Sequence, residues 1–563
     1  MPKTSWRAPI PGYARGAEFD PVFELPVHRH SGELTSQPLE LAEGGTLEFV
    51  PIVFDAPLEG CHVDLERVEA GRGERLWSGE PLFATEEGPR DPFRRLTHPV
   101  EVALEPGTAP FQLRWAGRGA CAGAAGALAR VAVRRPPDAL PPVLLVCSDT
   151  HRYDHALGDS AALMPRLQQI IENGGVVYDR AYSNASWTLP SIASTLTGLH
   201  PRYHRTGARV VPPPGKGARL PAGQFAIAWG DETNVLTAHP RALPNLGERL
   251  RRYGYETAAV VANTLYVGSG LLAEGFDVVI DVNGLRGAEV NRIAQQLMER
   301  NQPDRPLFLL VHYMDVHEFV DRGRQAGAAS GSAESLSAED LRNRYARQVR
   351  VADEYLGRLV AAWNTGIGLK YSLVVFYSDH GEHLREPGRP IERHGDSMDE
   401  VLLHVPLVVR YPSALGVSPG REDRIVSLVD LAPTVLDVVG AGADGAELHG
   451  RSLLRPEPWG AAERPVFADY QLAGDELASV RAGPLKLVVN LSRGTRALVD
   501  VSATAGELPE STRLRDDAAR REELSREFET YREHAERWSA GLATDRELDE
   551  DFEERLRAIG YAE

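Results

Sequence analysis

The stretch Val143-Leu-Leu-Val-Cys-Ser148 is an apolar run that leads directly into Asp149. Strands of an antiparallel sheet with one wet face alternate apolar and polar residues. Strands of a parallel sheet are buried on both faces and have no such alternation. The stretch therefore predicts a parallel strand that helices cover on both sides, with Asp149 at its carboxyl end.

Similar apolar runs recur further along the chain, and helical segments separate them. We predict strands over 256–262, 305–311, 371–377 and 405–410, and helices over 163–172, 246–252, 337–362 and 425–439. Strands that alternate with helices indicate a doubly wound α/β domain. In such sheets ligands bind outside the carboxyl ends of the strands.

Three predicted strands end in acidic residues or histidines that would meet at this edge. Asp149 follows the first strand, Asp315 and His317 follow another, and Asp379 and His380 follow a third. Carboxylate oxygens and imidazoles suit a divalent cation, and this set leaves Mn, Zn, Mg and Ca open. We predict one metal ion held by Asp149, Asp379 and His380.

Thr188 lies in the stretch Asn184-Ala-Ser-Trp-Thr-Leu-Pro190, just before a run with helical character. A hydroxyl at a helix N-terminus meets backbone N–H groups and the positive end of the helix dipole, which favour an anion. Thr188 could bind the metal and attack an ester, or it could simply cap the helix. His394 and His317 could bind a substrate oxygen or protonate a leaving group, whereas His383 is expected on a surface loop.

Composition divides the chain into five predicted parts. We expect an extended arm over 1–20, an all-β sandwich-like domain over 21–135 and a Pro-rich linker over 136–142. The α/β catalytic domain would occupy 143–464, and a β subdomain with a charged helical tail of the same unit would occupy 465–563.

The 563 residues carry a formal net charge of -18, which argues against nucleic acid or an anionic membrane as a partner. No apolar run is long enough to span a bilayer, and the first residues do not resemble a signal peptide. We therefore expect a cytoplasmic protein. The net charge does not exclude a small anionic ester as the substrate, because a metal ion in the site would hold it. The three cysteines predict no disulfide framework, and homo-oligomerisation is left open.

From about residue 142 onward the chain resembles the sulfatase branch of the alkaline phosphatase superfamily. The resemblance implies a doubly wound mixed sheet and rests on several motifs in the family's order: Asp149-Thr-His-Arg-Tyr-Asp154, Thr188-Leu-Pro-Ser-Ile-Ala-Ser-Thr-Leu-Thr-Gly198, Ser378-Asp-His-Gly-Glu382, His394-Gly395, Val405-Pro-Leu407, Asp430-Leu-Ala-Pro-Thr434 and Leu556-Arg-Ala-Ile-Gly-Tyr561.

Three positions depart from the family's sulfatase pattern. Thr188 replaces the Cys that those enzymes convert to formylglycine, Ile192 replaces an Arg, and Thr150 replaces the second Asp of a pair. No formylglycine is therefore expected. Threonine at this position resembles the superfamily's phosphodiesterases and its phosphoethanolamine or phosphoglycerol transferases. The resemblance to them implies a covalent phospho-threonine intermediate at Thr188.

The leading hypothesis is a metal-dependent hydrolase of phosphate or phosphonate esters. Its catalytic residues would be Thr188, His394 and His317, and its substrate contacts would come from His317, Asp315 and Arg152. Three alternatives stay open: a sulfuric ester hydrolase, a phosphoethanolamine- or phosphoglycerol-type transferase, and a catalytically silent binding protein that the metal structures.

Overall fold

The computed structural model of the protein describes strand segments between residues 33 and 134. It also describes residues 140–158, 160–210, 220–229, 232–301, 305–320, 336–386, 394–441, 448–454, 464–502, 514–542 and 546. The predicted arm, most of the predicted linker and the end of the predicted tail lie outside these residues. Among the helices in the described part, none combines the length and the apolar character that a bilayer crossing requires.

The described elements of the N-terminal region are all strands, arranged in two five-stranded sheets. One sheet contains β1 (Glu33–Thr35), β2 (Leu39–Leu41), β4 (Cys61–Glu69), β5 (Arg72–Gly79) and β9 (Gly107–Gly119). The other contains β3 (Gly45–Phe54), β6 (Leu82–Thr85), β7 (Gly88–Pro89), β8 (Val100–Leu104) and β10 (Gly126–Arg134). Their pairing is antiparallel except between β3 and β6, which agrees with the predicted all-β character.

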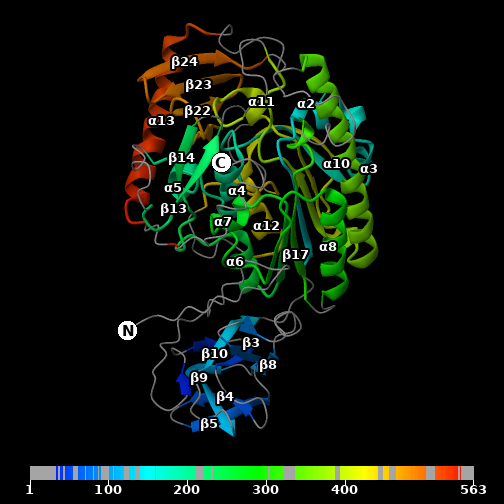
Figure 1. Ribbon diagram of the computed structural model, residues 1–563, viewed down its shortest axis with the longest axis vertical. Coiled ribbons are helices and arrows are strands. Elements are labelled where there is room, and N and C mark those ends of the chain that lie inside the picture. Colours follow the sequence, from blue (N-terminus) through cyan, green and yellow to red (C-terminus); the bar gives the residue numbers. More distant parts are fainter. Residues whose placement is uncertain are drawn as a thin grey trace.

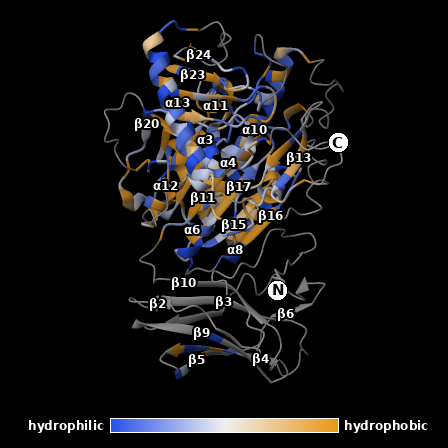
Figure 2. Cartoon of the chain, turned by 90° about the vertical axis from the view of Figure 1, so that its left-hand side faces the viewer, coloured by the Kyte–Doolittle hydropathy of each residue, from blue (hydrophilic) through white to orange (hydrophobic). Residues whose placement is uncertain are grey.

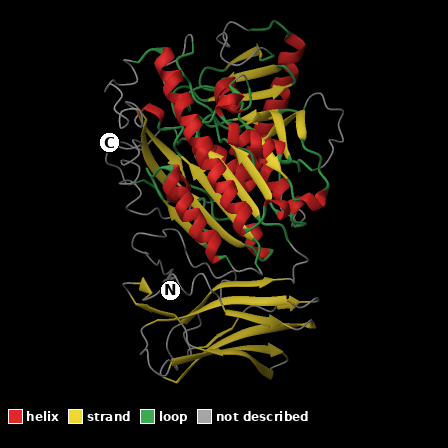
Figure 3. Cartoon of the chain, turned by 90° about the vertical axis from the view of Figure 1, so that its right-hand side faces the viewer, coloured by secondary structure: helices red, strands yellow, loops and turns green. Residues whose placement is uncertain are grey.

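The second region is built on an eight-stranded sheet of described strands (Figures 1 and 3). Its order is β16 (Val278–Asp281), β15 (Glu256–Val261), β17 (Leu307–Tyr313), β11 (Val143–Ser148), β18 (Leu373–Tyr377), β19 (Leu407–Arg410), β12 (Gly175–Tyr182) and β20 (Gly420–Ser427). Only β19 runs antiparallel to its neighbours. The predicted doubly wound mixed sheet is confirmed.

Successive residues of the central strand β11 enter two different cores, as the unbroken apolar run predicts. Val143 and Leu145 pack on the face that α4 (Thr188–Thr197), α6 (Leu246–Arg252) and α12 (Leu431–Val438) cover. Leu144 and Val146 pack on the face that α3 (Pro165–Glu172), α8 (Gly287–Arg300) and α10 (Ala338–Gly366) cover. Figure 2 shows the resulting layer of hydrophobic strands inside the domain.

The predicted helix over 425–439 is partly wrong. Ile425, Val426 and Ser427 end the edge strand β20, which pairs with β12, and α12 begins only at Leu431. A short apolar run fits a strand or a helix equally well, and here pairing with β12 decides in favour of the strand. The hairpin of β13 (Gln224–Trp229) and β14 (Glu232–Thr237) was also not predicted.

A small antiparallel sheet of β21 (Val466–Ala468), β22 (Leu477–Ala482), β23 (Leu485–Asn490) and β24 (Thr495–Asp500) completes this region. Helix α13 (Ala518–Ser539) packs on it through one stripe of residues, which are Leu524, Phe528, Tyr531 and Ala535. Many of its other residues are charged and exposed, as predicted for a solvated charged face, and much of the helix has hydrophilic colours in Figure 2.

This small sheet is joined to α11 (Glu400–Leu403) by a buried ionic cluster. Glu400 accepts hydrogen bonds from Arg481 of β22 and from Lys486 of β23, whose Nζ lies 3.0 Å from Glu400 Oε1. Burial raises the pKa of Glu400, but the charges of Arg481 and Lys486 outweigh it and lower the pKa to about 2. The cluster therefore favours the ionised carboxylate.

Replacing Leu145 with Ala should lower the free energy of unfolding of the α/β region by about 2–5 kcal/mol, because the deletion leaves a cavity in a closed core. Urea denaturation followed by tryptophan fluorescence measures the change. Leu415→Ala is the matched control, since Leu415 is 44% exposed. Equal destabilisation by the two substitutions would contradict the assignment of Leu145 to the core.

Glu400→Gln should lower the thermal midpoint most at neutral pH. A carboxylate whose folded pKa lies below its ordinary value of 4.5 contributes stability above that value and loses it as the pH falls toward 2. The difference in midpoint between wild type and variant should therefore shrink between about pH 4.5 and pH 2. Glu523→Gln, which changes an exposed ion pair, is the control, and a difference that does not vary with pH would contradict the prediction.

Candidate functional site

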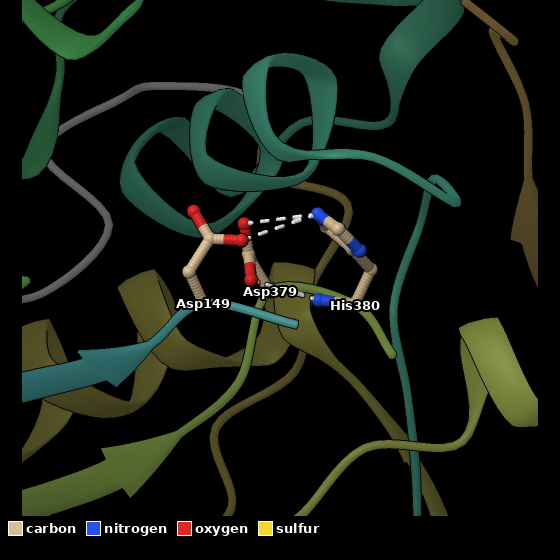
Figure 4. Close-up of side chains that lie close together, drawn as sticks. All are labelled: Asp149, Asp379 and His380. Atoms are coloured by element: carbon tan, nitrogen blue, oxygen red, sulfur yellow. Dashed lines mark hydrogen bonds and ion pairs between the residues drawn. The ribbon is translucent and has the colours of Figure 1, made fainter. Parts of the chain in front are cut away.

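The candidate site lies at the carboxyl ends of two adjacent parallel strands. Asp149 directly follows β11, whereas Asp379 and His380 follow β18 (Figure 4). Thr188 is the first residue of α4. All four side chains are fully buried. One potential ligand atom from each of Asp149, Asp379 and His380 lies within 4.8 Å of the others.

The two oxygens of Asp149 have different surroundings. Oδ2 accepts a hydrogen bond of 3.1 Å from Nε2 of His312, a residue of β17. Oδ1 has no hydrogen-bond partner within the described part of the chain and lies 3.5 Å from His380 Nε2. One oxygen is thus held while the other faces the cluster.

Asp379 and His380 repeat this arrangement. Asp379 Oδ1 accepts from the backbone N–H groups of Thr150 (3.3 Å) and His380 (3.0 Å), while its Oδ2 lacks a hydrogen-bond partner among the described residues. His380 Nδ1 donates to the carbonyl oxygen of Gly381 at 2.8 Å, which leaves Nε2 unprotonated and 3.5 Å from Asp379 Oδ2. Three electron-rich atoms therefore converge on one point (Figure 4).

Thr150 has a left-handed backbone with φ of 54°, which is costly for a β-branched residue. This conformation turns its N–H toward Asp379 while its hydroxyl donates to the carbonyl oxygen of Asp149. The family pattern has a second Asp at this position. Thr150 instead supports the cluster through its backbone N–H, which donates to Asp379.

The electrostatics of the cluster fit a cation. Burial and the neighbouring charge of Asp149 raise the pKa of Asp379 to about 7. Burial also raises the pKa of Asp149, but the hydrogen bond from His312 and the charges of His317, His312 and His380 outweigh it and hold the pKa below its ordinary value. Two buried carboxylates and an imidazole with atoms unused by hydrogen bonds are a donor set that suits a divalent metal ion.

Thr188 is placed for a role other than helix capping. The N-cap of α4 is Trp187, with extended backbone, and no side-chain capping bond is found there in the described structure. The Thr188 hydroxyl instead lies 3.2 Å from His380 Nε2 and 3.5 Å from Asp149 Oδ2. Pro190 falls within the first turn, where its missing N–H costs nothing.

His394 and His317 lie beside the cluster. The ring centroid of His394 is 4.6 Å from that of His380 and 5.2 Å from that of His317. His394 Nδ1 is 2.9 Å from Glu382 Oε2, and burial raises the pKa of Glu382 to about 8. The role of Glu382 was not predicted, although it closes the motif Ser378–Glu382.

Arg152 and Asp315, the other predicted substrate contacts, have partners of their own in the structure. Arg152 forms ion pairs with Asp154 and Glu386, and Asp315 Oδ2 accepts the backbone N–H of Gly287 at the start of α8. The prediction that His383 lies on the surface is wrong. It is fully buried, with Nδ1 3.3 Å from Glu386 Oε2 and Nε2 3.2 Å from Ser397 Oγ.

The segment 469–473, after β21, holds both the turn before Thr188 and the loop of His394. The carbonyl oxygen of Tyr470 accepts from Trp187 Nε1 at 2.7 Å, and the N–H of Asp469 donates to the carbonyl oxygen of Asn184 at 2.9 Å. The carbonyl oxygen of Gly395 accepts from the N–H of Leu472 at 2.8 Å. Sequence reasoning gave no signal for these contacts, because each of them uses at least one backbone atom.

The site thus combines a buried metal-type cluster at the carboxyl ends of strands in a doubly wound sheet with a hydroxyl at a helix N-terminus. The model of the sulfatase family matches residues 141–441, which is more than half of the chain. The protein therefore belongs to the sulfatase family.

Curated relatives include steryl-sulfatase from Mus musculus, 33% identical over 185 residues, which are 30% of this chain and 27% of that enzyme. N-acetylglucosamine-6-sulfatase from Capra hircus is 23% identical over 422 residues, which are 63% of this chain and 70% of that protein. The chain thus spans about a quarter of the first relative and more than two thirds of the second.

Two phosphonate monoester hydrolases of known structure share the fold. The enzyme from Silicibacter pomeroyi has a TM-score of 0.51 and 18% identity, covering 70% of this chain and 95% of its own. The enzyme from Agrobacterium radiobacter has a TM-score of 0.53 and 18% identity, covering 70% and 96%. At this identity the likeness shows the fold alone.

Asp149→Asn should abolish tight binding of a divalent cation, because the substitution removes one of two buried negative charges. Wild-type protein loaded with Mn²⁺ and desalted should retain about one ion per chain by inductively coupled plasma mass spectrometry, and the variant much less. Asp516→Asn, an exposed aspartate, is the control. Equal metal content in wild type and Asp149→Asn would contradict the assignment.

Proposed function

We propose that the protein is a metal-dependent hydrolase of phosphate or phosphonate esters in which Thr188 Oγ1 is the nucleophile. The observation that carries the proposal is the position of this hydroxyl. It lies 3.2 Å from His380 Nε2 and 3.5 Å from Asp149 Oδ2, at the N-terminus of the buried helix α4. The helix dipole and the cluster favour an ionised oxygen and an anionic ester at the same place.

Asp149, Asp379 and His380, together with the Thr188 oxygen, would hold the metal ion. A bound divalent cation supplies two effects there: it lowers the pKa of the hydroxyl, and it offsets negative charge on the ester under attack. The identity of the ion stays open among Mn, Zn, Mg and Ca, as the donor set allows.

The structure of the threonine side chain rules out conversion of Thr188 to formylglycine, so the residue would act unmodified. The Cβ of Thr188 carries a methyl group, so oxidation of its alcohol gives a ketone and not the aldehyde of formylglycine. The hydrate of an aldehyde has two hydroxyls on one carbon and can expel a bound oxyanion by reforming the carbonyl. Threonine has one hydroxyl, so its ester must be cleaved by water attacking the central atom, which supports a phosphorus ester as substrate.

The reaction would proceed in two displacements. Thr188 loses its hydroxyl proton to solvent, Oγ1 forms a bond to phosphorus as the bond to the leaving alcohol breaks, and His394 gives a proton to that alcohol. Water then forms a bond to phosphorus and gives one proton back to His394, while the bond to Thr188 Oγ1 breaks and this oxygen takes a proton from solvent. With Nδ1 hydrogen-bonded to Glu382, the proton of His394 that moves is the one at Nε2.

His317 would bind an ester oxygen beside the cluster, since its ring lies 5.2 Å from that of His394. We do not assign substrate contact to Arg152 or Asp315. The guanidinium of Arg152 is engaged by Asp154 and Glu386, and Asp315 accepts the N–H at the start of α8.

A second candidate function is hydrolysis of sulfuric esters with the same nucleophile. It is supported by the names of the curated relatives, which include steryl-sulfatase and N-acetylglucosamine-6-sulfatase. The two candidates share Thr188, Asp149, Asp379 and His380 and differ only in the central atom of the substrate.

Thr188→Ala should reduce turnover of bis(4-nitrophenyl) phosphate by about a thousandfold or more, because it removes the nucleophile. Initial rates on this substrate and on 4-nitrophenyl sulfate, with Mn²⁺ present, measure the loss and the preference. Wild-type protein quenched during turnover should also show a phosphorylated peptide that contains Thr188, which mass spectrometry detects.

Thr195→Ala is the matched control, since Thr195 is a buried threonine of the same helix whose hydroxyl donates to the carbonyl oxygen of Ser191. Faster turnover of the sulfate, lost in Thr188→Ala, would favour the second candidate. A rate that survives Thr188→Ala would mean that the nucleophile is another group.

A further inference from the structure

Each member of the metal cluster has one polar atom held in place and one turned toward the shared point. For Asp379 and His380 the holding groups are backbone atoms: the N–H groups of Thr150 and His380 for Asp379, and the carbonyl oxygen of Gly381 for His380. For Asp149 they are side chains from other elements: His312 in β17, and Asn263 just after β15, whose Nδ2 lies 3.4 Å from Oδ2. The predictions from sequence assigned no role to either residue.

The sheet register explains why His312 reaches Asp149. In the parallel pair of β11 and β17, His312 lies opposite Cys147. Paired residues of neighbouring strands share a face, and Asp149 follows Cys147 by two positions and shares that face too. His312 is fully buried, and its ring centroid lies 4.8 Å from that of Tyr266.

The hydrogen bonding of His312 is directed at one carboxylate. Its Nε2 is 3.1 Å from Asp149 Oδ2, whereas its Nδ1 has no hydrogen-bond partner among the residues described. This pattern assigns the tautomer with the proton on Nε2, so the ring donates to Asp149. A buried nitrogen without a partner costs stability, which a residue present only for packing would avoid.

We propose that His312 is a positioning residue of the metal site, with Asn263 as the second donor to the same oxygen. The two donors, with the Thr188 hydroxyl 3.5 Å away, contact Oδ2 of Asp149 and thereby leave Oδ1 for the ion. The inference deepens the proposed function and rests on its metal site.

Without the donor at residue 312, the Asp149 carboxylate would rotate more freely, because this terminal torsion is broad and roughly two-fold. Outer hydrogen bonds of this kind change metal affinity by about 10- to 100-fold when removed. The effect should therefore appear in metal binding itself, before any chemistry on a substrate.

Calorimetric titration of the metal-free, full-length protein with Mn²⁺ alone tests the proposal. His312→Phe keeps a ring but removes the donor, and its Kd for Mn²⁺ should rise about 10- to 100-fold. His312→Gln places an amide N–H near the position of Nε2, and its Kd should stay within about threefold of wild type. His239→Phe, a fully buried histidine bonded to Thr206, should leave Kd unchanged.

The order of the two variants separates positioning from packing. A packing role alone predicts that Phe, the closer match in shape, binds Mn²⁺ better than Gln, and this order would overturn the proposal. A wild-type Kd in His312→Phe would overturn it too. Thermal midpoints measured without metal identify a variant that fails to fold, and Asn263→Ala then provides the second test, with an expected rise in Kd.

The same titration keeps the two proposals apart. If wild-type protein binds Mn²⁺ and the variants follow the predicted order, but no ester is turned over, the reaction proposed above is wrong and the role of His312 is supported. If wild-type protein binds no divalent ion, the metal site and the role of His312 fail together.

Discussion

Two carboxylates, Asp149 and Asp379, are buried together at the ends of adjacent parallel strands, and the rest of the site depends on this concentration of charge. Burial and mutual repulsion disfavour two negative charges here, as the raised pKa of Asp379 shows. The surrounding donors, which include His312 and the N–H of Thr150, relieve part of the cost. They leave one oxygen of each carboxylate without a hydrogen bond among the described residues, and a cation bound there would neutralise the remaining negative charge.

The same constraint concerns Thr188, the proposed nucleophile. Helix α4 brings its N-terminus, with its positive dipole end, to the cluster and sets the Thr188 hydroxyl against His380 and Asp149. Segment 469–473 then connects the turn before Thr188 with the loop of His394 through backbone hydrogen bonds. This segment lies beyond residues 141–441, so the region that identifies the family does not by itself contain everything that holds the site together.

A bidentate ion pair holds that segment in place. Arg202, in α5 (Pro201–His204), donates to both oxygens of Asp469, and the Nη2–Oδ1 distance is 3.1 Å. Breaking one partner of such a buried pair leaves the other charge uncompensated, so the pair is costly to disturb. The small C-terminal sheet is therefore tied to the nucleophile side of the α/β region by charge as well as by apolar packing.

The sequence by itself determined the sheet class and the chemical nature of the cluster, and it singled out Thr188 as the proposed nucleophile. Unbroken apolar runs ending in Asp149 and Asp379 require strands buried on both faces, and parallel strands bring their carboxyl ends together. Only the tertiary structure decided which other groups serve those residues. His312 reaches Asp149 through strand register, and Glu382 contacts His394 twelve residues further along the chain. His383 is buried against Ser397, a contact that no periodic pattern in the sequence indicates. Side-chain periodicity reports which face is apolar, whereas hydrogen bonds between separate elements depend on how those elements are packed in space.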